Sequence, residues 1–329
     1  MHIPDAVLDP EVAVVMTGIG AIGLCAGLHA LRQQLGERTT VLMGTMAAFV
    51  FAAQMVNFPV GLLPISGHLL GGVLSAVMLG PWAGAVVIGA VLIVQCLLFG
   101  DGGLTALGAN FVNMGLIGSV VGYAIYAPIR RAIGGRAGVL IGAMVAAWFS
   151  VLLAAGAFTI ELAASGRWSS FFQDLSWMAL VHAAIGLGEA MITGLVLRFV
   201  LLTRPDLIYD PEPDALADTP RRAIQLVRLA LAALAIALGV AVFLAPFASE
   251  HPDGLEYVGA KLGFLNDAAP ALISPPIRDY AFPGIGPAHV KLATAIAGVV
   301  GTLVVFGVGL GLARIFSGTG PGGVSPDAA

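Results

Sequence analysis

Apolar runs of about twenty residues recur along this chain of 329 residues, and they constrain its fold more than any other feature. Because the hydrocarbon core of a bilayer is about 30 Å thick, runs of this length predict membrane-spanning helices. Charged residues make up only 10% of the chain, whereas soluble domains carry about a quarter, so an ordinary soluble fold is excluded. The sequence also lacks the alternating short segments of a membrane barrel. We therefore predict an all-α polytopic membrane protein.

The apolar runs divide the chain into two helical units. The expected helices cover residues 12–31, 40–57, 68–80, 83–99, 106–127, 138–162, 175–202, 223–245 and 289–312. The first seven would form a seven-span helix bundle over residues 1–202, and the last two would form a hairpin within residues 223–316. Residues 203–222 are polar and rich in Pro and Asp, which is typical of a linker. Residues 317–329 are expected to form a disordered tail.

Basic residues predict how these helices are oriented. They fall on alternate connections between the runs, near residues 32–38, 130–136 and 204–222. Connections rich in Lys and Arg stay on the cytoplasmic side of the membrane. We therefore expect the N-terminus outside and the C-terminus in the cytoplasm. The link 57–68, the turn 100–105 and the loops 163–174 and 246–288 would then face the outside.

The first five residues, Met1 to Asp5, are polar and include a possible metal chelate. The terminal amine, the backbone amide nitrogen of His2 and the His2 imidazole can close two chelate rings on one ion. A second imidazole would complete a planar set of four nitrogens, which suits Ni(II) or Cu(II) and can accept Co(II). No cleavable signal peptide is expected, so the chain should still begin at Met1, whose amine is then free to bind metal. The alternative is an ordinary frayed chain end.

Other polar residues are expected in the outer half of the bundle, where burial is costly and usually marks function. His68 begins its run on that side and is either a metal ligand or a capping histidine. His182 and Glu189 share one helical face at positions i and i+7. Because ligating imidazoles need orienting partners, we favour support of the ligands or helix–helix bonding for both residues, with direct metal ligation as the alternative. Asn110 and Asn113 are expected to donate hydrogen bonds rather than to bind metal.

Several other motifs have simpler explanations. Gly18–Gly23 matches the dinucleotide fingerprint GxGxxG, but it lies within an apolar run, so its small residues are expected to serve helix packing. The chain has neither the P-loop of ATPases nor the HExxH motif of zinc proteases. The loop sequence His251–Glu256 contains Asp-Gly, which favours a turn.

Four motifs together resemble a known family. They are Met1–Asp5, Ser66–Gly72, Gly108–Met114, and His182 followed by Gly186–Glu189. They look like the substrate-specific component of cobalt and nickel energy-coupling-factor transporters, the CbiM/NikM family of ABC importers. This resemblance covers about residues 1–202. The remainder, with Pro252–Glu256, looks like the small two-span NikN-like partner of the nickel systems, here fused to the first unit.

The resemblance implies a transporter subunit without a cofactor, whose substrate is Ni(II) or Co(II). Its ligands would be the Met1 amine, the amide and imidazole nitrogens of His2, and the His68 imidazole. It also implies that the chain lies in the inner membrane and works with a separate transmembrane coupling protein and with cytoplasmic ATPases. No nucleic-acid partner is implied. Nickel is favoured, because planar nitrogen ligation suits it and the C-terminal segment resembles a nickel-system partner. The family has Gly at position 6 and an aromatic residue at position 7, where this chain has Ala6 and Val7.

Two other classes of function remain. A stand-alone, ion-coupled secondary transporter would take up metal without ATPases and would depend on an intramembrane acid such as Glu189. A membrane enzyme would need an open metal coordination position and a general base. The only carboxylate near the expected chelate is Asp5, which we place with the supporting residues, so the enzyme ranks last.

Overall fold

The structure is a computed structural model, and it describes residues 2–32, 37–61, 63–209, 223–269 and 272–316. The helices are α1 (Pro10–Leu31), α2 (Glu37–Gln54), α3 (Gly72–Leu79), α4 (Pro81–Val94), α5 (Leu107–Asn110), α6 (Gly122–Ile133), α7 (Gly135–Leu162), α8 (Phe171–Thr203), α9 (Ala223–Phe243), α10 (Gly254–Leu262) and α11 (Val290–Phe316). π-Helical segments continue α4 as η1 (Gln95–Phe99) and α5 as η2 (Phe111–Val121). The strands β1 (Phe58–Pro59) and β2 (Ser66–Gly67) form one short antiparallel pair. The prediction of a helical chain is confirmed.

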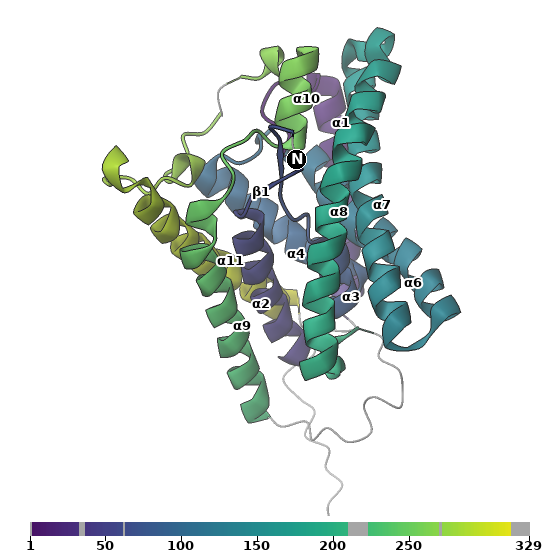
Figure 1. Ribbon diagram of the computed structural model, residues 1–329, viewed down its shortest axis with the longest axis vertical. Coiled ribbons are helices and arrows are strands. Elements are labelled where there is room, and N and C mark those ends of the chain that lie inside the picture. The colour runs from purple at the N-terminus through teal and green to yellow at the C-terminus, as the bar shows by residue number, and fades with distance from the viewer. Residues whose placement is uncertain (1, 33–36, 62, 210–222, 270–271, 317–329) are drawn as a thin grey trace, which may run out of the picture.

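Six stretches of the described residues are long and apolar enough to cross a membrane. They are Pro10–Leu31, Pro81–Phe99, Leu107–Ile133, Gly135–Thr203, Leu226–Phe247 and Val290–Phe316. The longest folds back near Gly166, whose φ is 99°, into α7 and α8, which pack along each other (Figure 1). Each of the six coincides with apolar runs expected from the sequence.

The run near residues 68–80 does not form a membrane-crossing helix. α3 has 8 residues, so it rises only about 12 Å against the roughly 30 Å of the hydrocarbon core. It begins after Gly71 and ends at Gly80, whose φ values are 77° and 94°. Glycine adopts such angles without a steric penalty, so the chain turns sharply at both ends of α3. Composition predicted the apolar character of this segment but not these turns.

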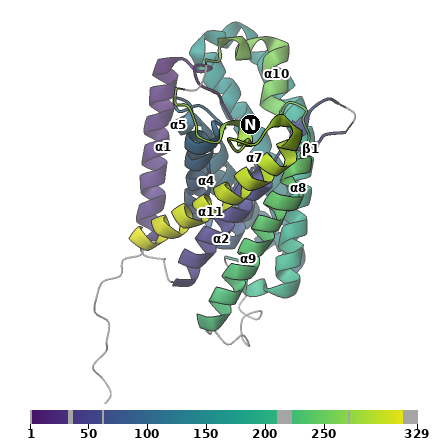
Figure 2. The same cartoon turned by 90° about the vertical axis from the view of Figure 1, so that its left-hand side faces the viewer.

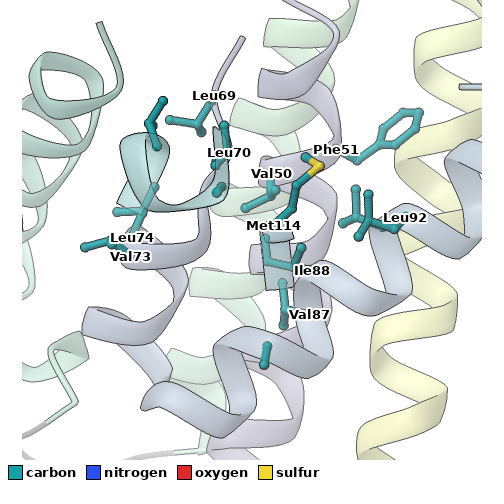
Figure 3. Close-up of a cluster of buried hydrophobic side chains, with 14 of the residues drawn as sticks. Val50, Phe51, Leu69, Leu70, Val73, Leu74, Val87, Ile88, Leu92 and Met114 are labelled. Carbon is teal, nitrogen blue, oxygen red and sulfur yellow. The ribbon is translucent and has the colours of Figure 1, made fainter. Parts of the chain in front are cut away.

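The core lies where α2, α3, α4 and η2 meet (Figure 3). Its labelled side chains are Val50, Phe51, Leu69, Leu70, Val73, Leu74, Val87, Ile88, Leu92 and Met114. Close backbone approach helps to form this core. A Cβ atom on Gly72 would lie 2.5 Å from the carbonyl carbon of Gly118, so α3 and η2 touch through glycines. This packing holds the segment that precedes α3 in a fixed position.

The C-terminal unit, residues 223–316, packs directly on the rest of the bundle. α9 and α11 lie against α2, and α10 lies against α8 (Figures 1 and 2). Alanines form the seam between α2 and α9, where Ala48 and Ala52 meet Ala237 and Ala241. The predicted division therefore describes the order along the chain, while in space the two units share one helical body.

The two ends of the bundle differ in character. At one end, Arg38 and Arg204 each bond the carboxylate of Asp206 at 2.8 Å. This pairing, together with a hydrogen bond from Tyr209 N to Val77 O, packs the first part of the predicted linker against the bundle. Residues 210–222 and the predicted tail 317–329 lie outside the described residues. The chain start, β1 and α10 lie at the other end (Figure 1).

Candidate metal-binding site

A cavity of about 420 Å³ opens at the end of the bundle where the chain begins. The N-terminal segment, the end of α2, the turn after η1 and the loops of the C-terminal unit all contribute to its wall. The polar side chains of the wall include His2, Asp5, Gln54, Asn57, His68, Asp101, Asp253, Glu256, Arg278, Asp279 and Tyr280. The predicted ligands His2 and His68 thus face one space together with several carboxylates from both units.

Asn110 holds the backbone of the N-terminal segment. Ile3 N donates to Asn110 Oδ1 at 2.8 Å, and Asn110 Nδ2 donates to Ile3 O at 3.2 Å. Gly103 N donates to the same Ile3 oxygen at 2.8 Å, and the Ile3 side chain is only 1% exposed. The segment is therefore anchored on both sides of residue 3, which fixes where His2 can lie.

Asp5 anchors the same segment rather than pairing with an imidazole. Its carboxylate accepts hydrogen bonds from Thr105 N at 2.8 Å, from Thr105 Oγ1 at 2.7 Å and from Leu272 N at 3.2 Å. Burial by itself raises the pKa of Asp5, but these hydrogen bonds outweigh it and lower the pKa below 3.8. Its backbone oxygen accepts from Ala269 N at 3.0 Å. Asp5 therefore ties the N-terminal segment to the C-terminal unit.

Ala6 adopts a backbone conformation that favours glycine. Its φ is 64°, and an L-residue in this left-handed region costs about 1–2 kcal/mol. We expect Ala6→Gly to stabilise the protein by about 1 kcal/mol, since relief of strain exceeds the added entropy of the unfolded chain. Thermal melting in detergent measures this. The matched control is Ala235→Gly on exposed α9, which should lower stability. A shift of the same sign in both variants would contradict the expectation.

The imidazoles of His2 and His68 lie together. Their ring centroids are 5.2 Å apart and their planes differ by 20°. His68 Nδ1 lies 3.1 Å from Leu69 O, so it donates there and the lone pair of the ring is on Nε2. Met1, the other expected ligand residue, lies outside the described residues. Among the described part of the chain, no three His, Cys, Asp or Glu side chains form a metal-binding group.

Both nitrogens of His2 have protein partners. Nδ1 lies 3.0 Å from Asp101 Oδ1, and Nε2 lies 3.2 Å from Gln95 Oε1. Burial lowers the pKa of His2 below 6.5, although the charge of Asp101 opposes this shift. The neutral imidazole, which is the form that binds metal, is therefore favoured at physiological pH.

Asp101 is itself held by the C-terminal unit. Tyr280 Oη donates to Asp101 Oδ2 at 2.6 Å. Burial, followed by the charge of Asp101, raises the pKa of Tyr280 well above 10.0, so its hydroxyl stays protonated and acts as the donor. The ring of Tyr280 stacks on Phe99, with centroids 4.7 Å apart. The orientation of His2 thus depends on a residue from far along the chain.

Glu189 supports the His68 segment through the backbone. Its buried carboxylate accepts from Leu70 N at 2.6 Å and from Gly71 N at 2.9 Å. Leu70 and Gly71 directly precede α3, which begins at Gly72, so the carboxylate holds the turn through which the chain enters this helix. Glu189, which was expected to support the site, therefore fixes the backbone of Leu70 and Gly71 and does not bond the His68 ring.

His182 and Asn113 are not among the residues that line the cavity. His182 Nδ1 donates to Met178 O at 2.8 Å, and a Cβ atom on Gly254 would lie 3.0 Å from His182 Nε2. Asn113 Nδ2 donates to Glu161 Oε2 at 3.1 Å. His182 therefore contacts the start of α10, and Asn113 contacts a buried acid that the sequence analysis did not select.

The sequence predicts a turn at Asp253, and this prediction is wrong, because a helix begins there. Asp253 is the N-cap of α10, with Glu256 N donating to Asp253 Oδ1 at 2.8 Å and Asp253 N donating to Glu256 Oε2 at 2.9 Å. Asp followed three residues later by Glu is a helix-start signal that could have been recognised. The Asp253 carboxylate lies 3.8 Å from His68 Nε2, and no sequence pattern indicates that these two residues are close.

Comparisons with known proteins agree with this architecture. The family described as cobalt uptake substrate-specific transmembrane region (CbiM) matches residues 2–207, and the PDGLE domain matches residues 227–318. A protein of Archaeoglobus fulgidus, named as a fused nickel transport protein NikMN, is 36% identical over 320 residues, which are 95% of this chain and 98% of that protein. The cobalt transport protein CbiM of Sorangium cellulosum is 30% identical over 63% of this chain and 94% of its own length.

Solved structures point the same way. A crystal structure of a truncated transition-metal transporter matches with a TM-score of 0.55 and 30% identity, over 61% of this chain and 99% of that chain. With several apolar helices of membrane-crossing length, the chain is a multi-pass membrane protein. It belongs to the CbiM family of cobalt uptake substrate-specific transmembrane proteins and carries a PDGLE domain in the same chain.

Proposed function

We propose that this protein is the substrate-binding membrane component of an energy-coupling-factor importer for Ni(II) or Co(II). The observation that carries the proposal is the pairing of the His2 and His68 rings, 5.2 Å apart, on the wall of a polar cavity. The firm anchoring of the N-terminal segment through Asn110 and Asp5 adds support, because a chelate built on a chain end requires that end to be held.

The proposed ligands are the Met1 amine, the amide and Nδ1 nitrogens of His2, and the Nε2 nitrogen of His68. Nδ1 is required at His2, because it closes a six-membered ring with the amide of the same residue. In this structure Nδ1 instead faces Asp101. Metal binding therefore needs either rotation of the His2 ring or displacement of that carboxylate.

The remaining parts of the proposal concern orientation and partners. The chain start and the cavity face the outside of the inner membrane, and the Arg38–Asp206–Arg204 cluster faces the cytoplasm, in keeping with the distribution of basic residues. A transmembrane coupling protein and cytoplasmic ATPases on other chains drive inward release. Nickel is favoured over cobalt, because four planar nitrogens suit it and the fused relative is named for nickel transport.

Metal titration of the purified chain tests the binding proposal. Its N-terminus is first verified by mass spectrometry, and Ni(II), Co(II) and Cu(II) are then added while d–d absorption is followed. Wild-type protein should give the spectrum of a planar nitrogen site. His68→Ala should weaken binding and alter that spectrum, whereas the control His29→Ala, on exposed α1, should leave both unchanged. Equal spectra for wild type and His68→Ala would contradict the ligand set.

Affinity should fall at acid pH, because bound metal displaces protons. The amide proton is always released, so Kd should rise about tenfold per unit of falling pH. Below about pH 7.7 the amine proton must also be displaced, which makes the slope about a hundredfold per unit. The imidazole of His2, whose pKa burial lowers below 6.5, adds its proton only at still lower pH. Titrations between about pH 6 and 9 measure the slope. A flat profile would rule out amide ligation.

Uptake into vesicles separates the proposed importer from a stand-alone transporter. The importer predicts no concentrative nickel uptake by this chain alone, and ATP-dependent uptake once the coupling protein and ATPases are co-expressed. A secondary transporter predicts uptake by the chain alone that responds to an ion gradient. Uptake without ATPases would overturn the energy-coupling-factor assignment while leaving the metal site intact.

A further inference from the structure

Each imidazole of the pair faces one carboxylate, and the C-terminal unit controls both carboxylates. His2 Nδ1 lies 3.0 Å from Asp101, which Tyr280 holds through a hydrogen bond of 2.6 Å. His68 Nε2 lies 3.8 Å from Asp253. Tyr280 and Asp253 both belong to residues 223–316, so this unit reaches the candidate site at two independent points.

Asp253 is fixed firmly in this position. The capping box with Glu256 sets the direction of its carboxylate at the start of α10. Ser66, which lies two residues before His68, binds the loop that precedes Asp253. Ser66 N donates to Pro252 O at 2.8 Å, and Ser66 Oγ donates to His251 O at 2.7 Å. The Asp253 side chain is 13% exposed. These contacts place a buried carboxylate beside His68 without relying on the metal.

Tyr280 is fixed in a comparable way. Asp279 and Tyr280 have φ values of 53° and 56°, a left-handed conformation that is costly for non-glycine residues. Such strain persists only where the surroundings hold it, and it is common at functional sites. Ile277 N, just before the strained pair, donates to Leu98 O at 3.0 Å. The loop therefore directs Tyr280 onto Asp101 at the expense of local backbone energy.

The charge of a bound ion explains why two carboxylates would be useful. A divalent ion with one deprotonated amide and neutral amine and imidazole ligands keeps a net charge of +1. An uncompensated charge in a largely enclosed site is strongly unfavourable. An acceptor that bonds the non-ligating N–H of an imidazole also orients the ring and increases its basicity, and Asp101 would do this for His2 once the ring rotates and turns Nε2 toward it. Asp101 and Asp253 are the carboxylates that contact His2 and His68.

We propose that the C-terminal unit is a built-in part of the metal site: Asp253 balances the charge of the bound ion beside His68, and Tyr280 positions Asp101 beside His2. This inference rests on the proposed function, since it assumes metal at the two imidazoles. It assigns to the PDGLE segment a direct role in binding rather than only in assembly.

Variants of Asp253 in the full chain separate charge from helix capping. Asn and Ser cap helices about as well as Asp but carry no charge, whereas Ala cannot cap. We expect Asp253→Asn and Asp253→Ser to raise the Kd for Ni(II) by about 10–100-fold, the usual loss for an outer-shell partner. Asp253→Glu should restore part of the affinity. The control Glu250→Gln removes an exposed nearby charge and should leave Kd unchanged.

Tyr280→Phe removes only the hydroxyl that holds Asp101, so it should raise Kd by less than Asp253→Asn does. Hydrogen exchange of α10 checks that the helix stays docked in every variant. Wild-type affinity in Asp253→Asn and Asp253→Ser, with loss only in Asp253→Ala, would reduce Asp253 to a helix cap and overturn the inference. If the wild-type chain did not give the spectrum of a planar nitrogen site with Ni(II), the proposed function would be overturned instead.

Discussion

Adding three residues before Met1, or replacing His2 by Ala, is expected to abolish nickel binding; a single added residue would not serve, because it would place the histidine third in the chain and create a new planar set of four nitrogens. The extension converts the terminal amine into an amide and moves the new amine out of chelate reach, while His2→Ala removes Nδ1 and its six-membered ring. Each change leaves His68 with an incomplete set of donors. We expect Kd to rise by about a thousandfold or more, which corresponds to about 4 kcal/mol.

Controls for this prediction use the same chemistry elsewhere on the chain. Three residues added after Ala329 lengthen the chain without touching the amine. His29→Ala removes an imidazole from the exposed surface of α1. Both should bind nickel as wild type does. If the N-terminally extended chain kept its affinity, the amine would not be a ligand, and the chelate would have to be abandoned.

Gly103→Ala is expected to abolish binding without removing any ligand. A Cβ atom at this position would lie 2.3 Å from Asp5 N and 2.6 Å from Pro4 C, which are both backbone atoms. Because backbone cannot rotate away, the N-terminal segment must shift, and the hydrogen bond from Gly103 N to Ile3 O at 2.8 Å is strained with it. Ligand sites tolerate displacements of only about 0.5 Å, so we expect a loss of at least about a hundredfold in affinity.

The matched control is Gly286→Ala, another loop glycine, where a Cβ atom meets nothing within 4 Å. It should bind and melt as wild type does. The melting temperature of the Gly103→Ala protein should stay close to that of wild type while its nickel affinity falls, since the displaced segment is short. Wild-type nickel affinity in Gly103→Ala would show that the position of this segment does not govern the site.

The sequence predicted the helical elements well because hydrophobic length is a local property. The runs 12–31, 138–162 and 289–312 correspond to α1, α7 and α11 within a few residues. Two expected runs are not among the six membrane-crossing stretches of the described residues: the run 40–57, which forms α2, and the run 68–80, which forms α3. The apolar residues of α3 reflect burial inside the bundle. α3 is limited by turns at Gly71 and Gly80, and Glu189 accepts hydrogen bonds from the residues just before it.

The positions of side chains around the cavity could be predicted for some residues and not for others. His2 and His68 lie together as the charge pattern and the resemblance implied, and Asn110 hydrogen-bonds the chain start. Asp101 and Asp253 were missed as site residues, because an acid in a polar loop is ordinary in sequence. Asp253 follows His68 by 185 residues, so only the packing of α10 on α8 brings them together.

X-ray absorption at the nickel K-edge of the metal-bound full chain tests the central claim most directly. The chelate predicts a planar first shell of nitrogen alone, with outer-shell scattering from two imidazoles, one of which disappears in His68→Ala. A six-coordinate shell rich in oxygen, or a spectrum that His2→Ala leaves unchanged, would contradict it.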